Sequence, residues 1–269
     1  MRPVIFYRKA DMEKAELEAA SKHFPCVPQR TDLQKNDLVI GRYSVLPFYR
    51  ELERDVRNLG AKLINSATEH EYIADLRNWV TDLEGLTPKT WTRMEDVDDD
   101  GPFVLKGLTN SRKDRWKTHM FAYDRQSMQD VYWRLMDDAL IAAQGVAIRK
   151  FVPLKTYYYD EINGMPITEE YRFFVAYNKI LEGAYYWSSH IDDLHEKNFR
   201  PEVLNVPLEF LESVIKRVNG SATAYVIDVA RTALDTWMVV ELNDLQMSGL
   251  SEVNPDALYA RLRMVIDAL

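Results

Sequence analysis

Two apolar stretches in the last third of the chain, residues 225–230 (Tyr-Val-Ile-Asp-Val-Ala) and 238–244 (Met-Val-Val-Glu-Leu-Asn-Asp), carry the most information. Both look like buried strands, yet Asp228, Glu241 and Asn243 stand where that pattern favours valine. Glu241 and Asn243 are two residues apart, so they share one face of a strand. Buried polar oxygens cost free energy unless they are paired or coordinated. These three side chains therefore predict a site for a hard cation such as Mg²⁺ that also carries phosphates.

Composition sets limits on the kind of protein this is. The chain has 269 residues, 46% hydrophobic and 28% charged, which is ordinary for a soluble globular protein of one domain or a few lobes. The net charge of −8 argues against a general nucleic-acid or membrane binder. No apolar run approaches the roughly 18 residues of a membrane span, and the N-terminus does not resemble a secretory signal. Cys26 is the single cysteine, which fits a reducing compartment, so we expect a cytoplasmic protein.

The first eighty residues alternate between strand and helix patterns. Asp11 is the expected first helix cap, Gly60 the expected end of the second helix, and residues 68–71 resemble a capping box for the third. This alternation predicts a small α/β lobe. The expected strands are residues 4–7, 38–40 and 62–64, and the expected helices are residues 11–22, 47–58 and 68–78.

The rest of the chain is richer in strands. The acidic run at residues 95–100 is expected to be a solvated loop, because Gly101 and Pro102 follow it. Turns are expected at residues 163–164 and 178–179. Further strands are expected at residues 103–105, 146–152, 156–159, 171–177 and 180–187, in addition to the two opening stretches, and further helices at residues 127–143, 207–218 and from 254 or 255 onward.

A lysine and a basic loop suggest a phosphate site. Lys106 ends the expected strand at residues 103–105, where its ammonium group could reach a phosphate or extend into solvent as an edge lysine. Residues 109–115 (Thr-Asn-Ser-Arg-Lys-Asp-Arg) combine small hydrogen-bonding side chains with three cations. Such a loop can present N–H groups to phosphate oxygens, and the alternative is a solvated basic loop.

Three more cations lie on later strands. Alternation places Arg149 and Lys150 on opposite faces, so at most one of them is expected to point into a given site. Arg172 is flanked by aromatic residues and is expected either to bind an anion or to pair with Glu170, which shares its face. The residues that follow Lys150 could form an apolar slot for a flat base, and they are Phe151, Val152 and Leu154.

Other candidates are less specific. His190 and His195 have a spacing that could bind a metal, but a polar loop is the expected structure there. The aromatic groups at residues 157–159 and 185–187 could line a pocket. The sequence has no Walker A loop, G-x-G-x-x-G, H-E-x-x-H, C-x-x-C or G-x-S-x-G motif.

Taken in their order along the chain, the lysine strand, the basic loop, the later cation strands and the two opening stretches resemble the ATP-grasp superfamily. Within it they resemble the divergent branch named for an arginine-to-lysine change. That branch includes a cell-division-cycle protein that assists assembly of translation initiation factor two. The resemblance spans roughly residues 85–250. It rests on residues 105–114, 148–154, 170–175, 225–229 and 240–243.

The resemblance implies an α/β (α+β) ATP-grasp fold. Residues 1–84 would form an N-terminal pre-grasp lobe, residues 85–152 the first grasp lobe, and residues 153–269 the second, with ATP clasped between the last two. The cofactors would be ATP and Mg²⁺. The chain departs from the family pattern in lacking a glycine-rich phosphate loop and in having Glu241 where the branch usually has aspartate.

The resemblance also implies roles for individual residues. Lys106 would contact ATP phosphates, and Arg172 would neutralise a phosphate or acyl-phosphate. Asp228, Glu241 and Asn243 would bind Mg²⁺. The remaining ATP contacts would come from Ser111, Arg112, Lys113, Asp114, Arg149, Lys150, Phe151, Val152, Leu154 and Glu170.

The implied activity is ATP-dependent ligation of a carboxylate to an amine through an acyl-phosphate, with release of ADP and phosphate. The substrates would be a small molecule or the end of a protein or peptide. One alternative is an ATP-binding assembly factor that docks a protein partner without ligation. The other is a structural α/β domain in which the same polar residues form ion pairs.

Overall fold

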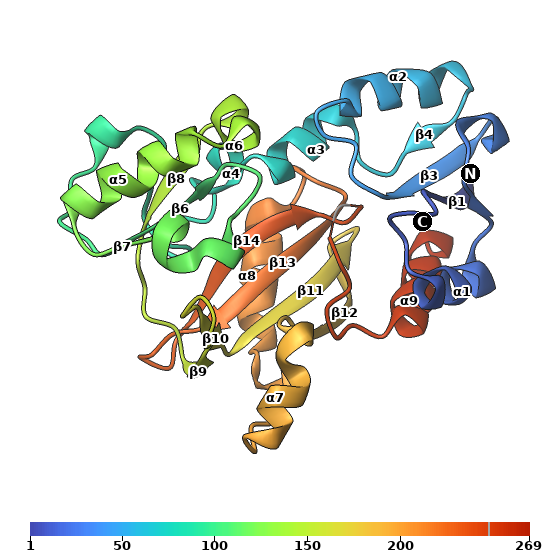
Figure 1. Cartoon of the computed structure of the whole chain (residues 1–269). Coiled ribbons are helices and arrows are strands. Elements are labelled where there is room, and N and C mark those ends of the chain that lie inside the picture. The colour runs from blue at the N-terminus through green and yellow to red at the C-terminus, as the bar shows by residue number, and fades with distance from the viewer. Residues whose placement is uncertain (247) are drawn as a thin grey trace.

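The computed structural model describes residues 1–246 and 248–269. An N-terminal parallel sheet with the strand order β2-β1-β3-β4 lies to the right of two antiparallel sheets in Figure 1. The two antiparallel sheets have the orders β5-β8-β6-β7 and β12-β11-β13-β14. The mixed α/β fold expected from the sequence is therefore confirmed, and the second antiparallel sheet carries the stretches with which the sequence analysis began.

The N-terminal sheet is buried on both faces, as parallel sheets usually are. Successive residues of β1 and β3 point to opposite sides: Ile5 and Ile40 pack toward α1 and α9, whereas Val4 and Val39 pack toward α2. The elements of this region are β1 (Arg2–Tyr7), α1 (Lys14–His23), β2 (Cys26–Val27), β3 (Asp37–Arg42), α2 (Tyr49–Asn58), β4 (Lys62–Leu63), α3 (Ala67–Ala74) and α4 (Leu76–Trp79).

The sheet that contains Lys106 has its own core, in which α5 and α6 pack against β6 and β8. Its elements are β5 (Thr90–Trp91), β6 (Phe103–Gly107), β7 (Phe121–Ala122), α5 (Arg125–Met136), α6 (Ala139–Gln144) and β8 (Val146–Lys150). A π-helix (Trp116–Met120) lies between β6 and β7. Short 3-10 turns occur at Arg30–Asp32, Met94–Asp96, Lys113–Arg115, Ser188–His190 and Val203–Asn205.

The central sheet packs on α8, which lies behind it in Figure 1. Its elements are β11 (Glu170–Ala176), β12 (Lys179–Tyr185), α7 (Ile191–Glu196), α8 (Leu208–Val218), β13 (Ala224–Arg231), β14 (Trp237–Asp244) and α9 (Pro255–Asp267). A separate hairpin of β9 (Thr156–Tyr159) and β10 (Pro166–Thr168) lies near the end of β13 in the same view.

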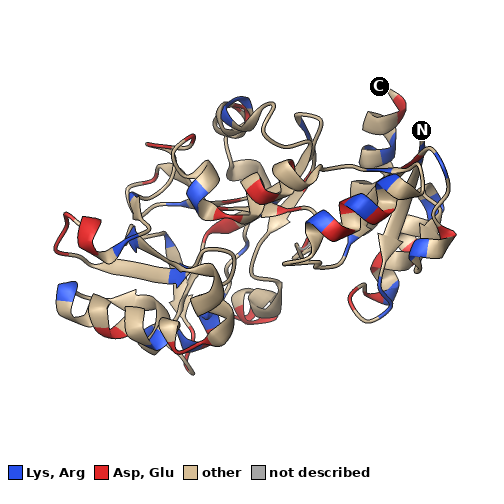
Figure 2. Cartoon of the chain, turned by 90° about the horizontal axis from the view of Figure 1, so that it is seen from above, with Lys and Arg blue, Asp and Glu red and all other residues tan. Residues whose placement is uncertain are grey.

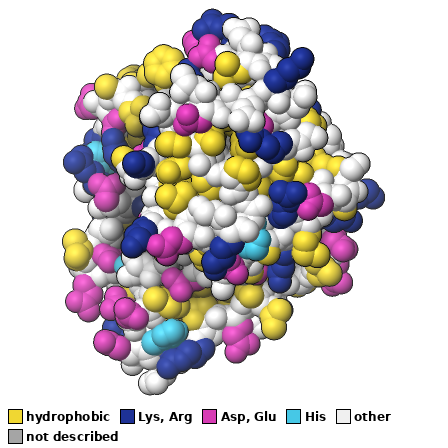
Figure 3. Space-filling view, turned by 90° about the vertical axis from the view of Figure 1, so that its right-hand side faces the viewer, with side chains coloured by type: hydrophobic (Ala, Val, Ile, Leu, Met, Phe, Trp, Pro, Cys, Tyr) yellow, Lys and Arg dark blue, Asp and Glu magenta, His cyan; other side chains and the backbone are white. Residues whose placement is uncertain are grey.

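The two chain ends lie on the same side of the molecule (Figures 1 and 2). Helices α1 and α9 pack together there, and the Tyr259 hydroxyl donates to Glu16 at 2.6 Å. Seen from this side, hydrophobic side chains gather near the middle of the surface with charged ones around them (Figure 3). Basic and acidic residues are mixed along the elements (Figure 2), so the negative net charge is not gathered on one region.

Several expected helix boundaries are wrong for local reasons. Helix α1 begins after Glu13, not Asp11. The expected helix at 68–78 is two helices, because Asp75 adopts an extended conformation and caps α4. The expected helix at 127–143 also divides, because the Asp138 side chain accepts the N–H groups of Leu140 and Ile141 and starts α6.

Candidate functional site

A cavity of about 470 Å³ lies between the Lys106 sheet and the central sheet. Strands β6 and β8 form one wall, β14 and the start of β11 form the other, and the β9–β10 hairpin and the π-helix complete the enclosure. Ten of the residues expected from the sequence line it: Lys106, Ser111, Lys113, Arg149, Lys150, Phe151, Val152, Leu154, Glu170 and Glu241.

One end of the cavity is a buried cluster of cations around the Glu241 carboxylate. Lys106 forms an ion pair with Glu241, and both side chains are largely buried. Arg149 donates to the carbonyl oxygen of Val240 at 2.6 Å and to the Thr87 hydroxyl at 2.7 Å, both of which are neutral. The cluster therefore holds more positive than negative charge.

The pKa values of the cluster are set first by burial and then by the neighbouring charges. Burial lowers the pKa of Lys106 below its ordinary value and lowers that of Arg149 to about 10. Burial alone would raise the pKa of Glu241, but the charges of Lys106 and Lys113 bring it below its ordinary value. Because burial disfavours the charged forms of Lys106 and Arg149, an anion such as a phosphate that entered beside them would stabilise both cations.

Lys113 borders this cluster from the loop that follows β6. Its Nζ donates to the Tyr186 hydroxyl at 2.7 Å and lies 4.2 Å from the centroid of the Tyr186 ring and 4.7 Å from that of Trp187. Cation–π contacts fix the ammonium group without neutralising it. Lys113 is therefore positioned beside the cavity with its charge intact.

The segment that links β8 to β9 crosses the other end of the cavity. Among the residues that the structure describes, neither the N–H nor the C=O of Val152 has a hydrogen-bond partner. The neighbouring N–H groups of Lys150 and Phe151 are used, by Lys89 and Pro102 respectively. An adjacent free donor and acceptor in an apolar slot fit the edge of a flat heterocycle, as backbone groups do in ligand pockets.

The side chains of Arg149 and Lys150 point in opposite directions, as alternation predicts, although both residues line the cavity. The Arg149 side chain reaches toward β14, whereas the Lys150 Nζ turns away to Asp99 at 2.5 Å and to the carbonyl oxygen of Gly101 at 2.8 Å. Asp98 pairs with Lys89 at 2.7 Å. The acidic run at residues 95–100 thus contributes counter-ions to lysines at the edge of this sheet.

The polar row on the central sheet is built by strand register. Arg172 on β11 lies opposite Asp228 on β13, which lies opposite Glu241 on β14. The guanidinium of Arg172 binds both oxygens of Asp228, and the Asn243 amide donates to Asp228 at 3.1 Å. The structure therefore brings Arg172, Asp228, Glu241 and Asn243 together, although only Glu241 lines the cavity.

Glu170 does not pair with Arg172, which was the alternative considered from the sequence. One of its oxygens accepts from the Thr168 hydroxyl at 3.3 Å, and the other is buried without a partner among the described residues. Burial raises the pKa of Glu170 to about 7. This carboxyl group faces the cavity and changes charge near neutral pH.

Besides Arg172, Asp228 and Asn243, two further expected residues lie outside the cavity lining. Arg112 is bound to Asp138 at the start of α6, and Asp114 is exposed beside Arg115. Of the aromatic groups considered, Tyr159 and Trp187 line the cavity. The histidines at 190 and 195 lie on a 3-10 turn and on α7, and no group of three or more His, Cys, Asp or Glu able to hold a metal occurs in the described part of the chain.

Other lining residues carried no sequence signal of a site. They come from β6, β7, β14, the hairpin and the π-helix, where apolar side chains look like ordinary core: Val104, Trp116, Met120, Phe121, Met165, Pro166, Met238 and Val240. Only the three-dimensional meeting of these elements shows that they enclose a cavity. No described helix has the length and apolarity needed to cross a membrane.

Residues 93–262 match the family model described as ATP-grasp domain, R2K clade family 3. The chain belongs to this ATP-grasp family. The match includes the polar row, the linker with Val152 and the cation cluster. No curated protein matches the chain significantly, and the narrower resemblance to the cell-division-cycle assembly factor stays a prediction.

Solved structures with the same fold cover nearly the whole ATP-grasp chain. The RimK domain protein ATP-grasp from Sphaerobacter thermophilus DSM 20745 is 16% identical, with a TM-score of 0.59 over 96% of this chain and 98% of that one. D-cycloserine synthetase DcsG is 12% identical, with a TM-score of 0.60 over 99% and 100%. ATP-grasp ligase PsnB, complexed with precursor peptide PsnA2 and AMPPNP, is 12% identical, with a TM-score of 0.60 over 96% and 97%. At these identities the likeness shows the fold.

Proposed function

We propose that this ATP-grasp protein is a Mg²⁺-dependent ligase that uses ATP to join a carboxylate to an amine. The observation that carries the proposal is the cavity itself. At one end are the backbone groups of Val152, which have no partner in the part of the chain that the structure describes, and at the other is a cation excess around Glu241. That arrangement matches the two ends of a nucleoside triphosphate, a flat base and a polyanion.

The cavity gives ATP one orientation. The adenine lies against Phe151, Val152, Leu154 and Met238, and the phosphates extend toward Lys106 and Lys113. Ser111 lines the same end and offers a hydroxyl and an N–H group to phosphate oxygens. Glu170 lies on the phosphate side, near Lys113.

The polar row fits Mg²⁺ as a partial ligand set. Asp228 and Glu241 are opposite one another on adjacent strands, and the Asn243 Oδ1 accepts no hydrogen bond among the described residues. Mg²⁺ is typically held by one or two carboxylates together with substrate phosphates and waters, so a closed cage of protein ligands is not required. When bound with ATP, Mg²⁺ would neutralise charge on the phosphates.

The proposed reaction has two steps. A carboxylate oxygen of the first substrate attacks the γ-phosphorus, the bond from that phosphorus to the bridging oxygen breaks, and ADP leaves. The amine then attacks the acyl carbon of the acyl-phosphate, phosphate leaves, and the amine loses a proton. Lys106, Lys113 and Arg172 would stabilise negative charge that develops on the transferred group, so no nucleophilic side chain is needed.

The proposal also assigns a role to each of three segments of the chain and names a class of substrate. Residues 1–84 would serve as a pre-grasp lobe, and residues 85–152 and 153–269 as the two lobes that clasp ATP. The related fold occurs in a synthetase for a small molecule, DcsG, and in PsnB, which was complexed with a precursor peptide. We therefore propose a small carboxylic acid or a peptide carboxylate as the phosphorylated substrate.

The test measures binding and turnover separately. Calorimetry with AMPPNP and Mg²⁺ should show binding, and ADP release should require both an acid and an amine from a mixed pool. A mass increase equal to the amine minus water would identify the ligated product. Binding without ADP release on any pool, together with a stable protein partner, would support the assembly-factor alternative, and absence of binding would contradict both.

A further inference from the structure

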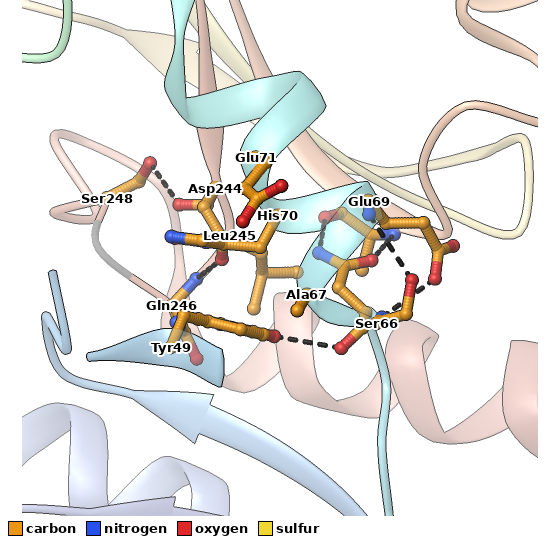
Figure 4. A network of polar contacts seen from close by, with 12 residues as sticks. Tyr49, Ser66, Ala67, Glu69, His70, Glu71, Asp244, Leu245, Gln246 and Ser248 are labelled. Atoms are coloured by element: carbon orange, nitrogen blue, oxygen red, sulfur yellow. Dashed lines mark hydrogen bonds and ion pairs between the residues drawn. The ribbon is translucent and has the colours of Figure 1, made fainter. Parts of the chain in front are cut away.

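A buried polar network joins the N-terminal region to the carboxyl end of β14. Figure 4 shows His70 on α3 between Tyr49 and Asp244. The His70 Nδ1 donates to the Asp244 carboxylate at 2.7 Å, and the Tyr49 ring stacks on the imidazole with centroids 3.9 Å apart. His70 is 1% exposed and Asp244 is 2% exposed. A buried carboxylate is costly unless it is paired, so this contact is a strong local constraint.

Asp244 is the last residue of β14 and organises the turn that follows. Its other carboxylate oxygen accepts the N–H of Gln246 at 2.8 Å, and its carbonyl oxygen accepts the Ser248 hydroxyl at 2.9 Å. The Gln246 side chain lies against Gly41 of β3, where an added Cβ would meet its Oε1 at 2.2 Å. The end of β14 therefore packs directly on the N-terminal sheet.

The same segment of the N-terminal region also binds the neighbouring strand. Asn65 accepts the N–H of Ala224 at 2.8 Å and donates to its carbonyl oxygen at 2.6 Å. Ala224 begins β13, and Asp244 lies next to it, opposite Tyr225. Residues 65–70 thus hold the start of β13 and the end of β14 together.

This edge of the sheet is close to the proposed metal ligands. Glu241 lies three residues before Asp244, and Asn243 is the residue immediately before it. Because side chains alternate along a strand, Asp244 and Asn243 point to opposite faces. A restraint on Asp244 from one face consequently fixes the backbone that presents Asn243 on the other.

We propose that His70 is a positioning residue: through Asp244 it fixes the end of β14 and so holds Glu241 opposite Asp228 and keeps the Asn243 amide bonded to Asp228. The inference rests on the proposed Mg²⁺-nucleotide function of that face. His70 itself touches no ligand, since the lining of the cavity does not include it. Residues that orient metal ligands from behind typically change metal affinity by about 10–100-fold when they are replaced.

The test compares three variants of the full chain. His70→Phe keeps a ring that can stack on Tyr49 but removes the donor to Asp244. His70→Asn restores a donor close to the position of Nδ1. Val56→Ala destabilises the core of α2 and the N-terminal sheet, and Val56 is not among the residues that bond Asp244. Thermal unfolding shows how well the variants match in stability.

Two readouts are used, and one of them needs no ligand. Hydrogen exchange of residues 238–246 in the ligand-free protein should be faster in His70→Phe than in Val56→Ala. Calorimetry should show that the Mg²⁺ concentration needed for half-maximal AMPPNP binding is at least about tenfold higher in His70→Phe than in the wild type. His70→Asn should recover most of both properties.

Each other result is decisive. Unchanged exchange and an unchanged Mg²⁺ requirement in His70→Phe would overturn the proposal. Faster exchange with an unchanged Mg²⁺ requirement would also overturn it, because the network would then be structural alone. If AMPPNP binding to the wild-type protein did not depend on Mg²⁺, the proposed function itself would fail and the positioning role with it, whatever the exchange shows.

Discussion

Arg172 and Asp228 form a bidentate ion pair across neighbouring strands, with Nε–Oδ1 and Nη2–Oδ2 distances of 2.8 Å. Asp228 is 1% exposed, and the third nitrogen of Arg172 donates to the carbonyl oxygen of Gly249 at 2.8 Å. A proposed metal ligand and a proposed phosphate ligand thus neutralise each other in the ligand-free protein. A phosphate group that arrives with Mg²⁺ offers each of them a new partner of opposite charge.

The first prediction concerns this pair. Asp228→Ala should abolish Mg²⁺-dependent ATP turnover and lower the free energy of unfolding by about 3–5 kcal/mol, because it leaves Arg172 buried and unpaired. Chemical denaturation and ADP release measure the two effects. The double variant Arg172→Met, Asp228→Leu should regain much of the stability while remaining inactive.

A surface ion pair provides the control for that experiment. Arg263 pairs with Asp267 on α9 at 2.9 Å, with both side chains more than a third exposed. Arg263→Ala should change the free energy of unfolding by less than about 1 kcal/mol. If Asp228→Ala lowered the free energy of unfolding by no more than Arg263→Ala does, the buried Arg172–Asp228 pair would not stabilise the fold.

The second prediction concerns the cation cluster. Lys106→Met should weaken AMPPNP binding by roughly 10–100-fold, because an ammonium group held in a buried site contributes about 1.5–3 kcal/mol to a charged hydrogen bond. Calorimetry at fixed ionic strength measures the change. Lys89→Met removes an exposed lysine paired with Asp98 and should leave the affinity unchanged. Equal affinities of the Lys106 variant and the wild type would contradict the assigned phosphate contact.

The third prediction uses pH. Burial raises the pKa of Glu170 to about 7 from an ordinary value of 4.5. A group with a raised folded-state pKa loses its contribution to stability as pH rises from the unfolded-state value to the folded-state value. Relative to Glu170→Gln, the wild type should therefore lose roughly 3 kcal/mol of unfolding free energy between pH 4.5 and pH 7 and no more above that. A difference between the two proteins that does not vary with pH would disprove the shift.

The fourth prediction separates the two ends of the cavity. Met238 lines the apolar end, close to the linker that carries Val152. Met238→Trp should fill the slot for the base and weaken ATP binding by more than about tenfold, since overpacking a formed pocket costs roughly 1–3 kcal/mol. Binding of inorganic tripolyphosphate should be unaffected. Equal losses for both ligands would show that the orientation of ATP is wrong.

The sequence allowed the polar row to be predicted because strand periodicity is a local property. Residues 241 and 243 must share a face, and the valine-rich surroundings make any polar group there conspicuous. The partner of Arg172 was not predictable in the same way. Glu170 is its neighbour along the strand, but Asp228 is its neighbour across the sheet, and cross-strand register is set by the whole fold.

The N-terminal cap of α3 is a second feature that the local sequence does not decide. Two overlapping frames fit a capping box, one beginning at Ser66 with Glu69 and one at Thr68 with Glu71. The structure uses Ser66 and Glu69. This frame buries His70 against Asp244, a contact between residues 174 positions apart that no local pattern contains.

The packing of α9 on the N-terminal region has a consequence for how the chain is made. The face of the first sheet that includes Ile5 and Ile40 is covered in part by Leu258, Tyr259 and Leu262 of α9. A ribosome therefore releases β1 and β3 long before α9 has been synthesised. One apolar face of the N-terminal sheet stays incompletely covered until then, so its final folding is expected to occur only after α9 has emerged.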